Sequence, residues 1–140
     1  MTIIFDFNRT LYDPDTSTLV PGAFDICRTY FKKGYELHLV SYPESKRASL
    51  VQDLGIDQFF KTITFTEDKE KVIKKIIQES KGPVYVVGDH LHNEIRIGNR
   101  YGAKTVWLKR GRFENLKPEH VEDVPWRTIT SLEEISAIIP

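Results

Sequence analysis

Several polar residues of the sequence stand where an apolar run ends, and the first of them is Asp6. It follows Ile3, Ile4 and Phe5, an unbroken apolar run that is typical of a strand buried on both faces. Ligands of open α/β sheets lie at the carboxyl ends of the strands, and a carboxylate there needs a cation or hydrogen-bond donors beside it. Taken alone, this stretch is explained equally well by a loop aspartate that caps a turn.

The same arrangement recurs further along the chain. Ser41 ends the strand-like run 35–40, and Asp89 follows the run 84–87, which is the most strand-like of the sequence. Right-handed crossovers bring the carboxyl ends of parallel strands to one edge of a sheet. We therefore expect Asp6, Ser41 and Asp89 to share that edge, although Ser41 by itself is better explained as a residue that only ends a strand.

Strand and helix patterns alternate along the chain. Residues 11–20 contain Pro14 and predict a loop or a short hairpin, and residues 111–125 are irregular and polar. The alternation predicts an α/β fold with a parallel sheet. The expected strands are residues 3–5, 35–40, 59–65, 84–87 and 104–108, and the expected helices are residues 22–33, 45–54, 69–81, 91–101 and 131–139.

Length and composition predict one domain over residues 1–140, which is long enough to bury a sizeable core. Basic and acidic residues both number 20, so no bulk charge attracts nucleic acid or an anionic membrane. No apolar run is long enough to span a bilayer, and the first residues lack a signal-peptide pattern. Cys27 is the only cysteine and cannot form an intrachain disulfide. We expect a cytoplasmic protein that could form a homo-oligomer.

Four stretches together resemble the motifs of the haloacid dehalogenase (HAD) superfamily. Residues 6–11, with the sequence DFNRTL, are similar to its first motif, Asp-x-Asp-x-Thr. Ser41 resembles the second motif, and Lys69 resembles the third, a lysine at the start of the helix before the fourth strand. Residues 86–95, with the sequence VVGDHLHNEI, resemble the fourth motif, Gly-Asp-x-x-x-x-Asp. The chain is thereby identified as a member of the HAD-like hydrolase superfamily, capless or with a minimal cap. Together with the alternation, this resemblance implies a three-layer sandwich, a HAD-like Rossmannoid fold whose five-stranded parallel sheet has the order 3-2-1-4-5.

The resemblance implies phosphoryl transfer through an aspartyl-phosphate. Asp6 would attack phosphorus as the nucleophile. Thr10 and Ser41 would bind the phosphoryl group, and Lys69 would also neutralise charge that develops on it. The substrate would be a phosphorylated small molecule or a phosphorylated macromolecule.

A Mg²⁺ cofactor is also implied by the resemblance. Its ligands would be the carboxylates of Asp6 and Asp89 and the backbone carbonyl of Asn8. Glu94 stands where the family carries a second acid, and it would reach the ion directly or through water, because Mg²⁺ usually keeps several waters.

Two competing assignments involve residues close to these motifs. Lys71 is an alternative to Lys69, since both lie at the start of the same helical pattern. His90 and His92 could join a zinc site, but residues two apart in the first turn of a helix point in divergent directions, which disfavours it.

Asn8 departs from the motif, because the phosphatases of the family carry a second aspartate at this position. That aspartate works as a general acid and then as a base, whereas asparagine has no titratable proton. Two functions remain open: a slow Mg²⁺-dependent phosphatase, and a non-catalytic HAD-like module that binds phosphate or protein. A dehalogenase is a minor third interpretation, since that branch also lacks the second aspartate.

Overall fold

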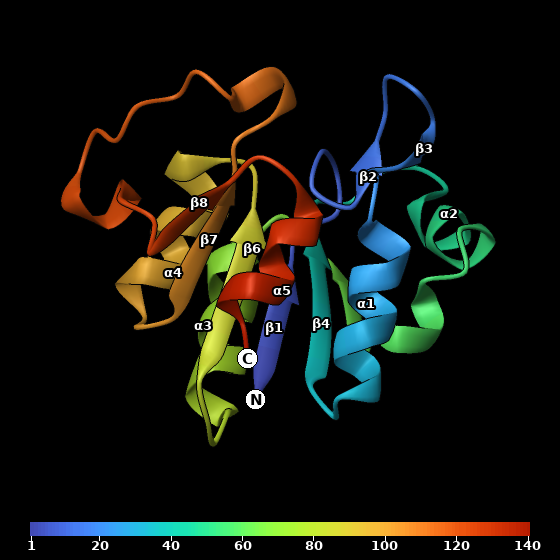
Figure 1. Cartoon of the computed structure of the whole chain (residues 1–140), viewed down its shortest axis with the longest axis horizontal. Coiled ribbons are helices and arrows are strands. Elements are labelled where there is room, and N and C mark those ends of the chain that lie inside the picture. The colour runs from blue at the N-terminus through green and yellow to red at the C-terminus, as the bar shows by residue number, and fades with distance from the viewer.

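A parallel sheet of six strands is the middle layer of the computed structural model, which describes residues 1–140 (Figure 1). Helices cover both of its faces, so the predicted α/β fold is confirmed. None of the helices is long and apolar enough to cross a membrane. In their order across the sheet, the strands are β5 (Thr62–Phe65), β4 (Glu36–Ser41), β1 (Thr2–Phe5), β6 (Val84–Gly88), β7 (Lys104–Leu108) and β8 (Arg127–Ile129). The helices are α1 (Ala23–Lys32), α2 (Arg47–Asp53), α3 (Lys69–Glu79), α4 (Arg96–Arg100) and α5 (Ile135–Ile138).

The first five strands have the predicted order, but β8 adds a sixth that the sequence did not predict. It pairs in parallel with β7 through three residues. Arg127 and Thr128 are exposed and only Ile129 is buried, so the strand carries no apolar run that could mark it. Residues 11–20 form the short antiparallel hairpin of β2 (Tyr12–Asp13) and β3 (Thr18–Leu19), one of the two outcomes expected for them.

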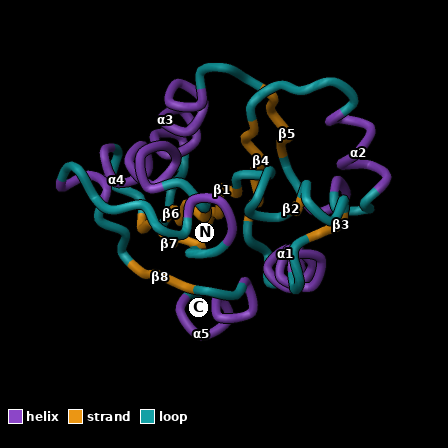
Figure 2. The backbone as a smooth tube through the Cα atoms, turned by 90° about the horizontal axis from the view of Figure 1, so that it is seen from above, coloured by secondary structure: helices purple, strands orange, loops and turns teal.

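The helices form one layer on each face of the sheet. Figure 2 shows α1 and α5 on one side and α3 and α4 on the other. Successive side chains of β1 point to opposite faces, so Phe5 joins the larger core under α1 and α5, and Ile4 joins a smaller core under α3. β1 is hydrogen-bonded on both sides, to β4 and to β6, which explains why its apolar run is unbroken.

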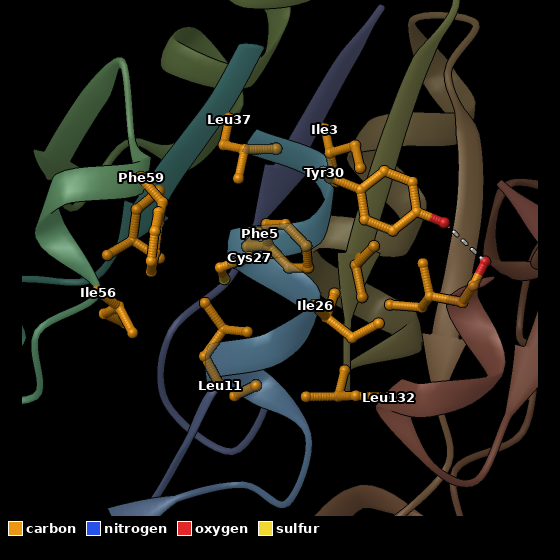
Figure 3. Close-up of a cluster of buried hydrophobic side chains, with 14 of the residues drawn as sticks. Ile3, Phe5, Leu11, Ile26, Cys27, Tyr30, Leu37, Ile56, Phe59 and Leu132 are labelled. Atoms are coloured by element: carbon orange, nitrogen blue, oxygen red, sulfur yellow. Dashed lines mark hydrogen bonds between the residues drawn. The ribbon is translucent and has the colours of Figure 1, made fainter. Parts of the chain in front are cut away.

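The C-terminal helix is fastened to the larger core by a buried tyrosine of α1 (Figure 3). The hydroxyl of Tyr30 donates to the carbonyl oxygen of Ile139 at 2.7 Å, and the carbonyl oxygen of Ile135 lies 3.1 Å from it. A buried hydroxyl is costly without a partner, so these carbonyls both satisfy Tyr30 and position α5.

The segment between β7 and β8, residues 109–126, is held by the buried side chain of Asp123. Its carboxylate accepts hydrogen bonds from Arg96 Nε at 2.6 Å and Arg96 Nη2 at 2.9 Å. It also accepts the backbone N–H groups of Glu119 and His120. The bonds from Arg96 hold the pKa of Asp123 well below its usual range. This cluster fixes a long segment whose earlier part, at Phe113, reaches the candidate site.

Replacing Asp123 by asparagine should therefore destabilise the protein by about 2–4 kcal/mol, because the charge of Arg96 would lose its buried partner. Urea unfolding at neutral pH measures this loss. The native carboxylate has a lowered pKa, so its contribution is present at neutral pH and is lost as the pH falls below the ordinary aspartate range. The difference between the two proteins should shrink accordingly.

Glu122→Gln is the matched control, since Glu122 pairs with Arg100 at the exposed surface of the same segment. An exposed pair contributes about 0–1 kcal/mol. Equal losses in the two variants would show that Asp123 does not fasten this segment.

Candidate active site

Four charged or hydroxyl side chains meet at the carboxyl edge of the sheet, and three of them, those of Asp6, Ser41 and Asp89, were expected to share it. Asp6 follows β1, Asp89 follows β6, Ser41 is the last residue of β4, and Lys69 is the first residue of α3. All four are buried, with 7% or less of their surface exposed. Burial of three ionisable groups together requires that they compensate one another.

Lys69 supplies the positive charge of the cluster. Its Nζ atom lies 2.7 Å from Asp6 Oδ1 and 3.6 Å from Glu94 Oε2. Burial alone would lower the pKa of Lys69, but the carboxylates of Asp6 and Glu94 outweigh it and raise that pKa, so the ammonium stays charged. Lys71, the competing candidate, is exposed and lines a different groove between β5 and α3. The lysine that faces the site is Lys69.

Asp89 carries an oxygen that nothing in the protein satisfies. Its Oδ1 atom lies 3.4 Å from the hydroxyl of Thr10, but its Oδ2 atom is buried and has no hydrogen-bond partner. Burial, together with the charges of Glu94 and Asp6, raises the pKa of Asp89 to about 9. Oxygen atoms of Asp6, Asp89 and Glu94 all lie within 4.8 Å of one another. Carboxylate oxygens in this arrangement fit a hard divalent cation.

Glu94 reaches the cluster through an irregular helix start. The predicted helix over 91–101 begins as a π-helical turn, η2 (Leu91–Ile95), and becomes α-helical at Arg96; Asn93 inside the turn has φ −124° and ψ −107°. Glu94 Oε1 accepts the backbone N–H groups of Asp89 and His90, both at 3.1 Å. It is packed so closely on Gly88 that a Cβ atom there would lie 2.1 Å from Glu94 Cγ. Any larger residue at position 88 would displace this carboxylate.

The loop after β1 leaves the backbone carbonyl of Asn8 free. The N–H groups of Thr10, Leu11 and Tyr12 all donate to the carbonyl of Phe7, whereas none of the backbone hydrogen bonds ends on the carbonyl of Asn8. The side chain of Thr10 is fully buried, and its hydroxyl lies 3.3 Å from Asp6 Oδ2. Asn8 therefore offers a carbonyl oxygen at the cavity and an amide side chain that cannot titrate.

Arg47, in the first turn of α2, is a site residue that the sequence did not reveal. Its Nη1 atom donates to Ser41 Oγ at 3.0 Å and to the carbonyl of Tyr42 at 2.9 Å, and its Nη2 atom pairs with Glu44. Ser41 Oγ therefore accepts from Arg47, and its own proton is donated to the carbonyl of Tyr42 over a long distance of 3.3 Å. Nothing in the sequence distinguishes this arginine from other basic residues of helical stretches, because its burial arises only in the fold.

These residues line a cavity of about 450 Å³ at the edge of the sheet. The imidazole of His90 borders it and packs against Phe113, with 4.3 Å between the ring centroids. His92 lies toward the 109–126 segment instead, with Nε2 2.8 Å from the carbonyl oxygen of Lys117. The two histidines thus have different surroundings. A larger groove of about 640 Å³, along β5 and α3, contains none of the clustered carboxylates. The residues of the smaller cavity are Asp6, Asn8, Arg9, Ser41, Tyr42, Pro43, Glu44, Arg47, Lys69, Asp89, His90, Asn93, Glu94 and Phe113.

The fold and the site define a three-layer α/β protein with an acidic site at the carboxyl edge of its sheet. The model of a family described as HAD-hydrolase-like matches residues 68–135. The HAD-hydrolase YfnB of Bacillus subtilis is 30% identical over 135 residues, which cover 86% of this chain and 54% of YfnB. A glyceraldehyde 3-phosphate phosphatase of Methanopyrus kandleri is 36% identical over 81 residues, which cover 51% of this chain and 35% of that protein. The chain thus spans about half the length, or less, of these curated relatives.

Solved structures with the same fold include two that were determined with magnesium. The magnesium-bound structure of YfnB from Bacillus subtilis has a TM-score of 0.77 and 16% identity in the superposition, which covers 98% of this chain and 97% of that one. The D,D-heptose 1,7-bisphosphate phosphatase of B. bronchiseptica, complexed with magnesium and phosphate, has a TM-score of 0.69 and 14% identity over 97% and 96% of the chains. The chain belongs to the HAD-like hydrolase superfamily.

The carboxylate cluster predicts that Asp89→Asn changes two properties of the protein: how its stability depends on pH without metal, and how its thermal midpoint responds to Mg²⁺. Without metal, the raised pKa of Asp89 means that the native protein holds a proton which the unfolded chain releases. Stability should therefore fall as the pH rises from about 4 to about 9, by at most about 1.4 kcal/mol per pH unit. Asp89→Asn should not show this part of the decline in urea unfolding with a chelator present.

With Mg²⁺ added, the thermal midpoint of the original protein should rise, because the ion binds only the native state, and that of Asp89→Asn should not. Asp53→Asn is the control, since Asp53 is an exposed residue of α2 outside the cavity. An undiminished response to Mg²⁺ in Asp89→Asn would rule out a metal site at this residue.

Proposed function

We propose that the protein is a Mg²⁺-dependent phosphohydrolase that works through an aspartyl-phosphate on Asp6. The observation that carries the proposal is the buried contact of 2.7 Å between Lys69 and Asp6, beside the unpartnered Oδ2 atom of Asp89. A carboxylate paired with a lysine, beside a second carboxylate whose oxygen has no partner in the protein, is equipped to bind a cation and to meet an anionic phosphoryl group. Relatives that are named phosphatases support the same class of reaction.

Asp6, Asp89 and the carbonyl of Asn8 would hold Mg²⁺, with Glu94 beside it. When bound, the ion supplies positive charge that offsets the repulsion between a carboxylate and a phosphate ester. Because Glu94 Oε1 already accepts two backbone N–H groups, its main contribution would be to position Asp89 and Lys69.

In the first half-reaction, a carboxylate oxygen of Asp6 forms a bond to phosphorus, and the bond from phosphorus to the ester oxygen breaks. The electron pair of that bond leaves with the ester oxygen, which then takes up a proton. Lys69 and the hydroxyl of Ser41 would hold the phosphoryl oxygens in line. Thr10 was expected to bind the phosphoryl group too, but it is fully buried and outside the cavity lining, so its hydroxyl would position Asp6 instead. In the second half-reaction, water attacks phosphorus, releases inorganic phosphate and restores the carboxylate of Asp6.

Asn8 makes both proton transfers slow, because it can neither protonate the leaving group nor deprotonate the water. His90 is a poor replacement as a base. Its Nδ1 atom accepts the backbone N–H of His92 at 3.2 Å, and burial lowers its pKa, so the neutral ring carries its proton on Nε2 as a donor. The same residue 8 favours the alternative proposal of a degenerate module that binds phosphate or protein without turnover.

The remaining expectations stay predictions, because the relatives are longer than this chain. They are a single capless domain, a phosphorylated small molecule or macromolecule as substrate, a cytoplasmic location and a possible homo-oligomer. The hairpin of β2 and β3 would border the open site, since its Asp15 pairs with Arg9, which lines the cavity.

Restoring the acid with Asn8→Asp should raise the hydrolysis of alkyl phosphates by ~10²–10⁴-fold, the usual contribution of general acid–base catalysis. That gain corresponds to roughly 3–5 kcal/mol of barrier. Aryl phosphates should gain less, because their leaving groups depart as stable anions. Steady-state kcat/KM values for one alkyl and one aryl phosphate, with Mg²⁺, measure the difference.

Asn8→Ala is the matched control and should gain nothing, and Asp6→Asn should abolish turnover in both backgrounds. If Asn8→Asp folds and binds Mg²⁺ yet hydrolyses no phosphoester, the enzyme is refuted and the binding module takes its place.

A further inference from the structure

Arg9 adopts a backbone conformation that is unusual for its residue type. Its φ angle is 64°, in the left-handed region, and its N–H donates to the carbonyl of Tyr12 at 2.7 Å. Residues other than glycine, asparagine or aspartate are uncommon there, and such strain is concentrated at functional sites. The conformation places Arg9 in the wall of the cavity that contains Asp6.

Of the arginine and lysine side chains that line this cavity, that of Arg9 has the fewest partners within the protein. Lys69 is paired with two buried carboxylates. Arg47 is engaged by Ser41, the carbonyl of Tyr42 and Glu44. Arg9, by contrast, makes one ion pair of 3.5 Å with Asp15, whose side chain is 77% exposed, although the side chain of Arg9 is itself only 19% exposed.

The number of cations at the site limits how many anionic groups of a substrate can be compensated there. One phosphoryl group would be compensated by Lys69 and by the metal at Asp6 and Asp89. A second anionic group on the same substrate would need another cation, and Arg9 is available for it. Because the carboxylate of Asp15 is 77% exposed, water screens its pair with Arg9, so an incoming anion can replace Asp15 at little cost. The guanidinium fork suits a carboxylate or a phosphate equally well.

We propose that Arg9 recognises a second anionic group, a carboxylate or a phosphate, in the leaving group of the substrate. The proposal rests on the proposed function, because the first anion is the phosphoryl group at Asp6. It makes the substrate class a phosphate ester that carries another anion close to the ester oxygen.

Three phosphonates that cannot be hydrolysed test this proposal by titration calorimetry at a fixed concentration of free Mg²⁺. Methylphosphonate carries the first anion alone, phosphonoacetate adds a carboxylate, and methylenediphosphonate adds a second phosphonate. We expect at least one of the last two to bind roughly tenfold more tightly than methylphosphonate, about the effect of one added charge-assisted contact. Which of them does so distinguishes a carboxylate substrate from a bisphosphate.

Arg9→Asn should remove most of this preference and weaken methylphosphonate far less. Asparagine tolerates the left-handed region, so the thermal midpoint should not fall, and Arg9→Gly provides a second variant free of strain. Asp15→Asn is the opposing control, because it releases Arg9 from its partner and should preserve or increase the preference.

Two outcomes would overturn the proposal. One is equal binding of the three phosphonates by the original protein, and the other is a preference that survives in both Arg9→Asn and Arg9→Gly. If instead none of the phosphonates binds in the presence of Mg²⁺, the proposed function fails together with the inference.

Discussion

The buried ammonium group of Lys69 is the interaction on which the candidate site depends. Three carboxylates, those of Asp6, Asp89 and Glu94, lie together away from water, and Lys69 is the cation that contacts two of them. Its single charge leaves the cluster with an excess of negative charge, and burial together with this excess raises the pKa of Asp89. Without metal, a proton on Asp89 offsets this excess, and a divalent cation could offset it in the same place.

The rest of the structure serves to hold this excess charge in one place. Central β1 and its neighbour β6 bring Asp6 and Asp89 to the same edge, and Asp68 caps α3 through the N–H of Lys71, which fixes the helix start that carries Lys69. The absence of a side chain on Gly88 admits Glu94. The scaffold thus brings together the residues that the proposed phosphoryl transfer needs, except a titratable side chain at position 8. This combination favours a slow enzyme, and it argues against a protein that has the fold but no catalytic function.

The sequence predicted those features that local patterns determine. Apolar runs marked β1 and β6, and the alternation of strands and helices determined which edge would carry Asp6 and Asp89. Features that depend on contacts between distant segments were not predictable. The π-helical turn at Asn93 arises where Glu94 packs on Gly88, and β8 has one buried residue in three. Position 9 is an arginine and not a glycine, so the sequence did not predict its left-handed conformation. The burial of Arg47 is a consequence of the fold.

The central claim is that Asp6 accepts a phosphoryl group, and Asn8 makes this claim directly measurable, because an enzyme without a base for water should hydrolyse its intermediate slowly. The measurement is the mass of the intact protein after incubation with acetyl phosphate and Mg²⁺ and a rapid acid quench. The account predicts the added mass of one phosphoryl group, located on the peptide that contains Asp6 and absent from Asp6→Asn. Phosphorylation that persists in Asp6→Asn, or an unmodified protein that nonetheless hydrolyses the donor, would contradict it.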